Sequence, residues 1–207
     1  MLLEGSHALG LPLTQGQADA LSWLAAELAR WSSRINLTAI LDPIEMADKH
    51  ILDSLTVLRA LESGPLTLLD AGTGAGFPGL PLAIARDDLS VTLVDAVAKK
   101  VGFLKHAIAH LGIAPRVRAI HLTLRGNPAK EGLGVFDAAV SRALADPGRW
   151  AALAAPYVRP GGTLVVMAGS DAAAAPLPGW THPSLERYRL PLTGAGRTVL
   201  AYRKPPR

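Results

Sequence analysis

The first part of the chain carries apolar side chains at the spacing of amphipathic helices. Residues 14–17 read Thr-Gln-Gly-Gln, the pattern of a capping box, and apolar residues then recur every three or four positions. We predict a helix over about 15–33, whose apolar face consists of Leu21, Leu24, Leu28, Trp31 and Ile35. A second helix is predicted from Asp42, an N-cap residue followed by Pro43, to about residue 63. Its expected apolar face consists of Ile44, Ala47, Ile51, Leu55 and Leu58.

From residue 66 onward, short apolar runs alternate with helical stretches. The runs predict strands over 66–70, 90–95, 117–122, 136–141 and 163–167, and helices over 78–85, about 98–111 and about 146–157. Strands joined by helical crossovers are typical of a doubly wound, mainly parallel sheet. Two further β-like segments, about 185–190 and 198–203, are expected to pair antiparallel at one edge, after a loop. We therefore expect one α/β domain over 1–207, with a helical cap over 1–64 and a core over 65–207.

The composition excludes several classes of protein. A hydrophobic fraction of 49% and a charged fraction of 18% belong to a globular chain. The absence of cysteine excludes disulfides, thiolate metal ligands and cysteine nucleophiles, and we expect no metal site. The sequence has neither a signal peptide nor an apolar run of membrane-spanning length, so we expect a cytoplasmic protein without a membrane partner. The net charge of +4 suits nucleic acid, but also a surface that is simply rich in arginine.

A glycine-rich segment follows the first predicted strand, where residues 70–79 read DAGTGAGFPG. This pattern serves a dinucleotide or another adenosine ligand, or simply a tight turn. Asp70 favours a cationic ligand, because a pyrophosphate prefers main-chain N–H groups without a carboxylate beside them. The segment resembles the first motif of class I methyltransferases, and Asp95 resembles the acidic residue that binds the ribose of S-adenosylmethionine. The expected cofactor residues here are Asp70, Gly72, Gly74, Gly76, Phe77 and Asp95.

The residues after the fourth predicted strand bear on which atom is methylated. They read SRAL, whereas enzymes that methylate exocyclic amines usually carry an Asn/Asp-Pro-Pro-aromatic motif there. Methylation at C5 of a pyrimidine usually needs a cysteine nucleophile, and the chain has none. Guanine N7 presents an in-plane lone pair, so its methylation needs positioning and no proton removal. The sequence therefore favours a ring nitrogen as the acceptor.

Several stretches together resemble the bacterial small-subunit ribosomal RNA guanine-N7 methyltransferase family, RsmG, also called glucose-inhibited division protein B. They are NLTAI (36–40), DP.EM (42–46), KHILDSL (49–55), DAGTGAGFPGLPLAI (70–84), LVDAVAKKVGFL (93–104) and SRAL (141–144). The resemblance implies a class I, Rossmann-like fold and methyl transfer from S-adenosylmethionine to N7 of a guanine in 16S rRNA, leaving S-adenosylhomocysteine. It also implies 16S rRNA or the small ribosomal subunit as partner. We expect a monomer.

The resemblance and the helix pattern single out further residues. Arg142 matches the cofactor pattern and could hold the cofactor carboxylate or an RNA phosphate. His50 and Asp53 share a helix face and either line the substrate entrance or form a helix-surface pair. With Arg142, they are our candidates for positioning the reacting groups. The candidates for RNA phosphate contacts, or for a solvated helix face, are Arg34, Lys99, Lys100 and Lys105.

The chain also departs from the family pattern. Leu124-Arg125 stand where the family usually has a small residue and a Glu that reaches the adenine, and we retain both as cofactor candidates. Ala168-Gly169 replace Lys-Gly, and Arg197-Thr198 replace Arg-His. A non-catalytic RNA-binding module thus remains an alternative. An NAD-dependent oxidoreductase is a weaker one, because no Tyr-x-x-x-Lys pair is present.

Overall fold

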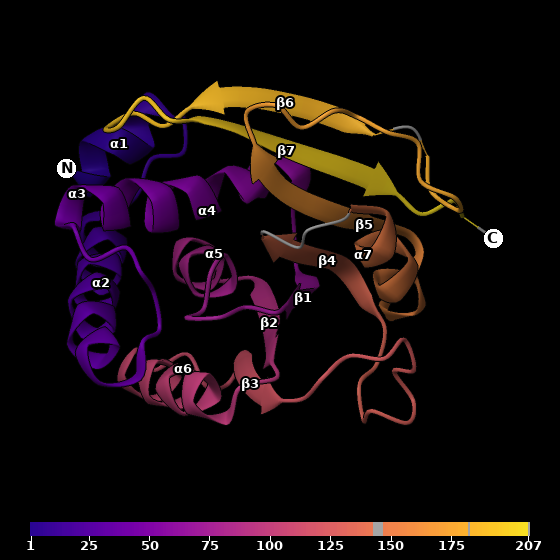
Figure 1. The fold of residues 1–207 in the computed structure, drawn as a ribbon, viewed down its shortest axis with the longest axis horizontal. Coiled ribbons are helices and arrows are strands. Elements are labelled where there is room, and N and C mark those ends of the chain that lie inside the picture. The colour runs from indigo at the N-terminus through magenta and orange to yellow at the C-terminus, as the bar shows by residue number, and fades with distance from the viewer. Residues whose placement is uncertain (143–146, 182, 207) are drawn as a thin grey trace.

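The centre of the protein is a seven-stranded sheet, seen in a computed structural model that describes residues 1–142, 147–181 and 183–206 (Figure 1). The strands are β1 (Leu66–Ala71), β2 (Leu89–Asp95), β3 (Val117–His121), β4 (Phe136–Arg142), β5 (Val158–Gly169), β6 (Ser184–Arg189) and β7 (Gly196–Arg203). Their order is β3-β2-β1-β4-β5-β7-β6, with β1 to β5 parallel and β7 antiparallel to both β5 and β6. The predicted parallel sheet and its antiparallel edge are confirmed. The order reverses between β1 and β4, and such a switch point opens a crevice at the carboxyl ends of the strands.

Helices cover both faces of this sheet (Figure 1). They include α1 (Leu2–Ala8), α2 (Gln15–Ile35), α5 (Gly79–Ala85), α6 (Ala98–His110) and α7 (Pro147–Ala154), the last continued by the 3-10 turn η3 (Ala155–Tyr157). Successive strand residues point to opposite faces, so Leu68 packs with the helices from α1 to α6, whereas Leu69 packs with α7 and η3. The predicted helices after β1, β2 and β4 are present; residue 146, the expected start of the last one, lies outside the described residues.

The N-terminal helix α2 begins where the sequence predicts. Thr14 Oγ1 accepts a hydrogen bond from Gln17 N at 3.3 Å, and Gln17 Oε1 accepts one from Thr14 N at 2.8 Å, which completes the capping box. Of the predicted apolar face, Leu21, Leu24 and Leu28 are fully buried, and the two later residues are partly buried. Helix α1 was not predicted, because seven residues are too few for a periodic pattern to be recognised.

The second predicted helix is present but irregular. It consists of α3 (Pro43–Met46), the π-helix η1 (Ala47–Leu52), α4 (Asp53–Leu55) and the 3-10 helix η2 (Thr56–Ala60). Asp42 caps it as expected, accepting a hydrogen bond from Glu45 N at 2.8 Å. The prediction that Ile44 belongs to the apolar face is wrong, because this side chain is 51% exposed. A π turn holds more residues than an α turn, so the buried side after residue 46 is out of phase with Ile44.

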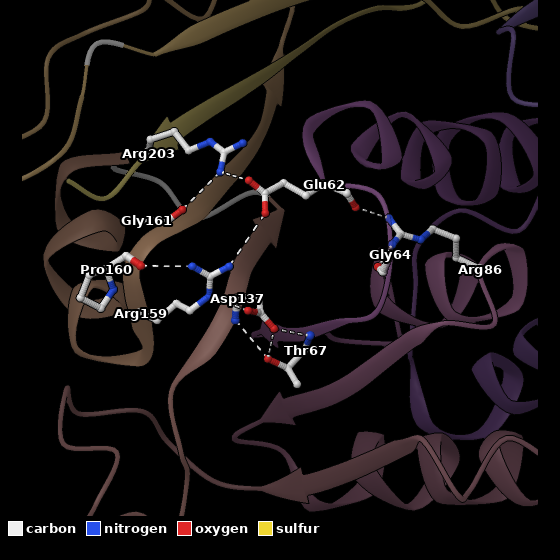
Figure 2. A network of polar contacts seen from close by, with 9 residues as sticks. All are labelled: Glu62, Gly64, Thr67, Arg86, Asp137, Arg159, Pro160, Gly161 and Arg203. Atoms are coloured by element: carbon white, nitrogen blue, oxygen red, sulfur yellow. Dashed lines mark hydrogen bonds and ion pairs between the residues drawn. The ribbon is translucent and has the colours of Figure 1, made fainter. Parts of the chain in front are cut away.

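A polar network joins the amino ends of the parallel strands (Figure 2). Asp137 on β4 accepts hydrogen bonds from Thr67 N and Thr67 Oγ1 at 2.8 and 2.7 Å, and its other oxygen lies 2.6 Å from Arg159 Nε. Glu62 lies between Arg159 and Arg203 and forms ion pairs with both. Arg159 belongs to β5, which begins at residue 158 and not at 163 as predicted. These contacts connect β1, β4, β5 and β7 at the amino end of the parallel strands.

Among the described residues, no helix is long and apolar enough to cross a membrane. Within the same ranges, no group of three or more His, Asp or Glu side chains is placed to hold a metal ion.

Candidate functional site

Asp70, the last but one residue of β1, lies beneath the glycine-rich loop. It is fully buried, and its Oδ2 accepts hydrogen bonds from Thr73 Oγ1 at 2.6 Å and from Gly79 N at 2.8 Å. Its Oδ1 has no hydrogen-bond partner among the described residues. Burial raises the pKa of Asp70 to about 6, although the bonds from Thr73 and Gly79 act in the opposite direction. In this structure Asp70 therefore fixes the loop against the first turn of α5.

Two glycines of the loop, Gly74 and Gly79, differ in the space around their Cα atoms. Gly74 has a φ of 62°, a left-handed conformation that other residues rarely adopt, and a Cβ added to it would meet no atom within 4 Å. A Cβ at Gly79 would instead lie 2.2 Å from Leu93 Cδ2, so this glycine is required for helix–strand packing. The loop is thus open on the side of Gly74 and closed at Gly79. An open, left-handed main chain of this kind lets a ligand approach closely.

Asp95 ends β2 and joins the two loops that border the crevice. Its Oδ2 accepts a hydrogen bond from Gly74 N at 2.9 Å, and its Oδ1 accepts one from Val97 N at 2.8 Å. A carboxylate oxygen can accept more than one hydrogen bond, so both oxygens of Asp95 retain capacity for the hydroxyl groups of a ribose. The residues present therefore fit an adenosine ligand that carries no phosphate, as the sequence predicted.

Phe77, at the end of the loop, is enclosed by two of the predicted residues. The His50 ring stacks on it with a centroid separation of 4.7 Å and an interplanar angle of 14°. The Arg142 guanidinium carbon lies 5.3 Å from the centre of the same ring, and Arg142 Nη1 donates a hydrogen bond to the Lys49 carbonyl at 3.1 Å. The structure thus brings together the η1 helix, the glycine loop and the end of β4. The next two residues of the SRAL stretch, 143 and 144, lie outside the described residues.

His50 is a buried, neutral imidazole. Its Nε2 lies 2.8 Å from Thr38 Oγ1, and its Nδ1 has no partner among the described residues. Burial, with a smaller contribution from the Arg142 charge, lowers the pKa of His50 to about 3. The ring therefore carries no charge at neutral pH, and its role at this site is packing and hydrogen bonding.

Asp53 is buried one turn further along the helical segment. Tyr188 Oη donates a hydrogen bond to Asp53 Oδ1 at 2.7 Å, and Arg197 Nε lies 3.5 Å from Asp53 Oδ2. Burial raises the pKa of Asp53, opposed by Tyr188, Arg197 and Arg142. Since both His50 and Asp53 are buried, the alternative of a helix-surface pair is wrong. Tyr188 was missed by sequence reasoning, because no local pattern connects residues 135 positions apart.

A cavity of about 350 Å³ lies beside these residues, at the carboxyl ends of β4 and β5. We call it the β4–β5 cavity; it is lined by Ile40, Lys49, His50, Asp53, Arg142, Met167, Ala168, Gly169 and Arg197. Ala168 and Arg197, from two of the three departures from the family pattern, thus lie on its wall. A larger cavity of about 480 Å³ between α1, α2 and α3 has a mainly apolar lining and contains none of the predicted site residues. The β4–β5 cavity is the better candidate for chemistry, because charged side chains and predicted site residues line it.

The loop after β3 holds the third departure, Leu124-Arg125. Arg125 N donates a hydrogen bond to Glu131 Oε1 at 3.0 Å, and Gly126 N donates one to Tyr157 Oη at 2.8 Å. The Arg125 side chain is exposed, and Leu124 packs against the core on the α7 side of the sheet. In the described structure neither residue forms a hydrogen bond with the glycine loop.

The predicted phosphate-binding residues lie on two neighbouring helices. Arg34 is near the end of α2, and the three lysines are on α6, which packs against α2 through a contact of 2.7 Å between His106 Nε2 and Glu27 Oε1. Arg34, Lys99 and Lys105 are exposed, and Lys100 is half-buried. Within the described residues these four cations form no ion pair, which leaves their charges available.

Comparison with known proteins agrees with this geometry. The model of the family "rRNA small subunit methyltransferase G" matches residues 17–176. A protein named ribosomal RNA small subunit methyltransferase G from Anaeromyxobacter dehalogenans (strain 2CP-C) is 46% identical and covers 98% of this chain and 96% of its own length.

Two solved structures share the fold. A SAM-dependent methyltransferase from Aquifex aeolicus has a TM-score of 0.57 at 15% identity, covering 79% of this chain and 94% of its own. One from Geobacter sulfurreducens, in complex with S-adenosyl-L-homocysteine, has a TM-score of 0.55 at 16% identity, with 75% and 90% covered. The extent of the family match and of the sequence identity shows that this chain belongs to the rRNA small subunit methyltransferase G family.

Proposed function

We propose that this protein transfers the methyl group of S-adenosylmethionine to N7 of a guanine in 16S rRNA. The observation that carries the proposal is the pairing of two sites across Phe77. On one side lie the open glycine loop and Asp95, which suit an adenosine without phosphate. On the other lies the β4–β5 cavity, whose cations Lys49, Arg142 and Arg197 suit a nucleotide.

The cofactor is assigned to the loops after β1, β2 and β3. Asp95 would receive the ribose hydroxyls, and Gly72 and Gly74 would let the main chain lie against the ligand, on a loop fixed by Asp70. Gly76, predicted with them, serves the packing of the loop, because a Cβ there would lie 2.4 Å from Leu80 Cδ1. The adenine would lie toward Leu124-Arg125, which can offer main-chain groups and an apolar surface but not the carboxylate that is usual there. Arg142, beside Phe77, would hold the cofactor carboxylate or an RNA phosphate.

The reaction needs positioning more than acid–base chemistry. S-adenosylmethionine supplies the methyl group: the N7 lone pair forms the new N–C bond, the S–C bond breaks, and its electron pair remains on sulfur in S-adenosylhomocysteine. No proton leaves the base, so the neutral His50 and the partnered Asp53 are not needed as general bases. Residues around the cavity contribute by holding the base and excluding water.

The rRNA itself would contact the helices beside the crevice. Arg34, Lys99, Lys100 and Lys105, which form no ion pair with another described residue, carry charges that can replace the counterions of RNA phosphates. The partner is 16S rRNA or the small subunit, met in the cytoplasm by a monomer that forms one domain.

The test is to map modified guanines in 16S rRNA from a strain that lacks the family member, with and without this protein. The protein should restore one 7-methylguanosine, detected by mass and by borohydride–aniline cleavage, which is diagnostic of N7 methylation. A non-catalytic RNA-binding module would leave the guanine unmodified. A methylated base that resists cleavage would contradict the assignment to N7.

A further inference from the structure

The β4–β5 cavity combines three cations with one carboxylate. Asp53 is the one acidic side chain among the described residues that line the cavity, and Lys49, Arg142 and Arg197 are the cations of the same lining. We infer that this cavity receives the target base and that Asp53 selects guanine by accepting hydrogen bonds from its N1–H and N2 amino groups. The inference rests on the proposed function and identifies the residue that reads the base.

The chemistry of the bases gives the reason for a carboxylate. Enzymes that act on a base extruded from its stack read it through its Watson–Crick edge. Guanine presents there two adjacent donors, N1–H and the N2 amino group, and an ionised carboxylate is acceptor-only. Adenine presents an unprotonated N1 at the same edge, which the carboxylate would repel. One acidic side chain can therefore distinguish guanine from adenine.

The fold holds the Asp53 carboxylate in place and leaves it capacity to accept. Tyr188 and Arg197 each approach a different oxygen, at 2.7 and 3.5 Å, and each oxygen can accept a further bond. The π-helix strengthens this arrangement, because it places Asp48 and Asp53, five residues apart, toward the same β6–β7 hairpin. Asp48 Oδ2 accepts hydrogen bonds from Thr193 N and Thr193 Oγ1 at 2.7 and 2.6 Å. The helix that carries Asp53 is thus fixed to the hairpin at two points.

Reading at this edge also protects the reacting atom. N7 lies on the opposite, Hoogsteen edge of guanine, and a donor bound to it would occupy the lone pair that must attack. With the Watson–Crick edge on Asp53, N7 stays free. Lys49 pairs with Glu45 at 2.6 Å, so Arg142 and Arg197 are the cations of the cavity wall that can bind O6 and the phosphates of the target nucleotide.

The experiment compares small-subunit rRNA carrying guanosine or inosine at the methylated position. Inosine retains N7, O6 and N1–H but lacks the N2 amino group. The wild-type protein should methylate guanosine with a kcat/KM roughly 10- to 100-fold above that for inosine, the size of one hydrogen bond to a charged group. Asp53→Ala should lower kcat/KM for guanosine and bring the guanosine-to-inosine ratio close to 1.

The matched control is Asp137→Asn, which neutralises a hydrogen-bonded carboxylate at the amino end of the strands, away from the cavity lining. It should leave the ratio at the wild-type value. If Asp53→Ala does not fold, Asp53→Asn takes its place, because the amide keeps the size of the side chain but removes the charge and one acceptor, and it should also lower the ratio.

Three results would overturn the inference while leaving the proposed function intact. They are equal wild-type rates on the two RNAs, an unchanged ratio in Asp53→Ala, and a loss confined to S-adenosylhomocysteine binding, which would assign Asp53 to the cofactor ammonium group. A wild-type protein that methylates neither RNA would instead refute the proposed function, and this inference with it.

Discussion

The two ends of the parallel strands differ in whether their polar groups have hydrogen-bond partners. At the amino end, both oxygens of Asp137 are hydrogen-bonded, and Glu62 pairs with two arginines (Figure 2). At the carboxyl end, Asp70 Oδ1 and His50 Nδ1 are buried without a partner among the described residues. Buried polar groups are normally satisfied, and exceptions call for an explanation. The polar groups at the amino end hold the strands together, and those at the carboxyl end lie where we propose that the ligands bind.

The pKa values express the same contrast. Burial acts to raise the pKa of Asp137, but hydrogen bonds from Arg159 and Thr67 outweigh it and lower the pKa. At Asp70 burial prevails and raises the pKa to about 6. The first carboxylate is stabilised in its charged form by the fold, and the second is not.

The largest effect is expected from Arg142→Ala. Removing this guanidinium should lower kcat/KM for methyl transfer by roughly 100-fold or more, as the loss of a preorganised charge in a water-excluded site does. Asp137→Asn, at the opposite end of the sheet, is the matched control. Its kcat/KM should stay within about threefold of wild type under folding conditions, because the charge of Asp137 is distant from the site and is screened. Methyl incorporation into rRNA measures both. Equal losses in the two variants would abolish the distinction between the ends.

Asp95→Ala should weaken the binding of S-adenosylhomocysteine by roughly 10- to 100-fold, because hydrogen bonds from the ribose to a charged acceptor are lost. Titration calorimetry measures the change, again with Asp137→Asn as the control. An unchanged affinity in Asp95→Ala would show that the ribose binds elsewhere.

The unfolding free energy should depend on pH with opposite signs at Asp70 and at Asp137. The folded state retains a proton on Asp70 that the unfolded chain releases above pH 3.8, so the contribution of Asp70 to the unfolding free energy falls by roughly 3 kcal/mol as the pH rises to about 6. Relative to Asp70→Asn, the wild type should therefore lose stability over that interval.

Asp137 should behave in the opposite way. Its folded pKa is lowered, so its contribution is complete above pH 3.8 and is lost as the pH falls through the folded value. Urea unfolding of the wild type, Asp70→Asn and Asp137→Asn between about pH 3 and 8 tests both signs. Parallel curves for all three proteins would contradict them.

The smallest effect concerns RNA approaching the carboxyl end. Lys99 and Lys100 lie in the first turn of α6, just after β2 ends at Asp95. Changing both to Ala should reduce the slope of log affinity against log salt concentration by roughly 1.5, and changing both to Arg should preserve it. An unchanged slope in the Ala variant would mean that these lysines are merely solvated.

The sequence predicted the parts of the molecule whose cause is local. Thr14 and Gln17 form a capping box because they are three residues apart, and the loop after β1 needs its glycines because of its own backbone conformation. The π-helix could not be foreseen, because it depends on contacts of Asp48 and Asp53 with a hairpin more than a hundred residues later. The candidates His50, Asp53 and Arg142 were recognised because they lie in stretches that resemble the family. Tyr188 was not recognised, because it meets Asp53 only in the folded structure. The early start of β5 was missed because Gly161 and Gly162, which indicate a turn, lie within the strand.

The order in which the chain is synthesised matters because of the β6–β7 hairpin. The glycine loop and Asp95 are complete once β2 has been made, whereas Tyr188 and Arg197, which hold Asp53, are synthesised much later. Synthesis proceeds from the N-terminus, so the segments before β6 leave the ribosome first. A nascent chain that ends before residue 184 would therefore present the cofactor loop beside an unfinished cavity wall, and would acquire base selection only after the hairpin has been made.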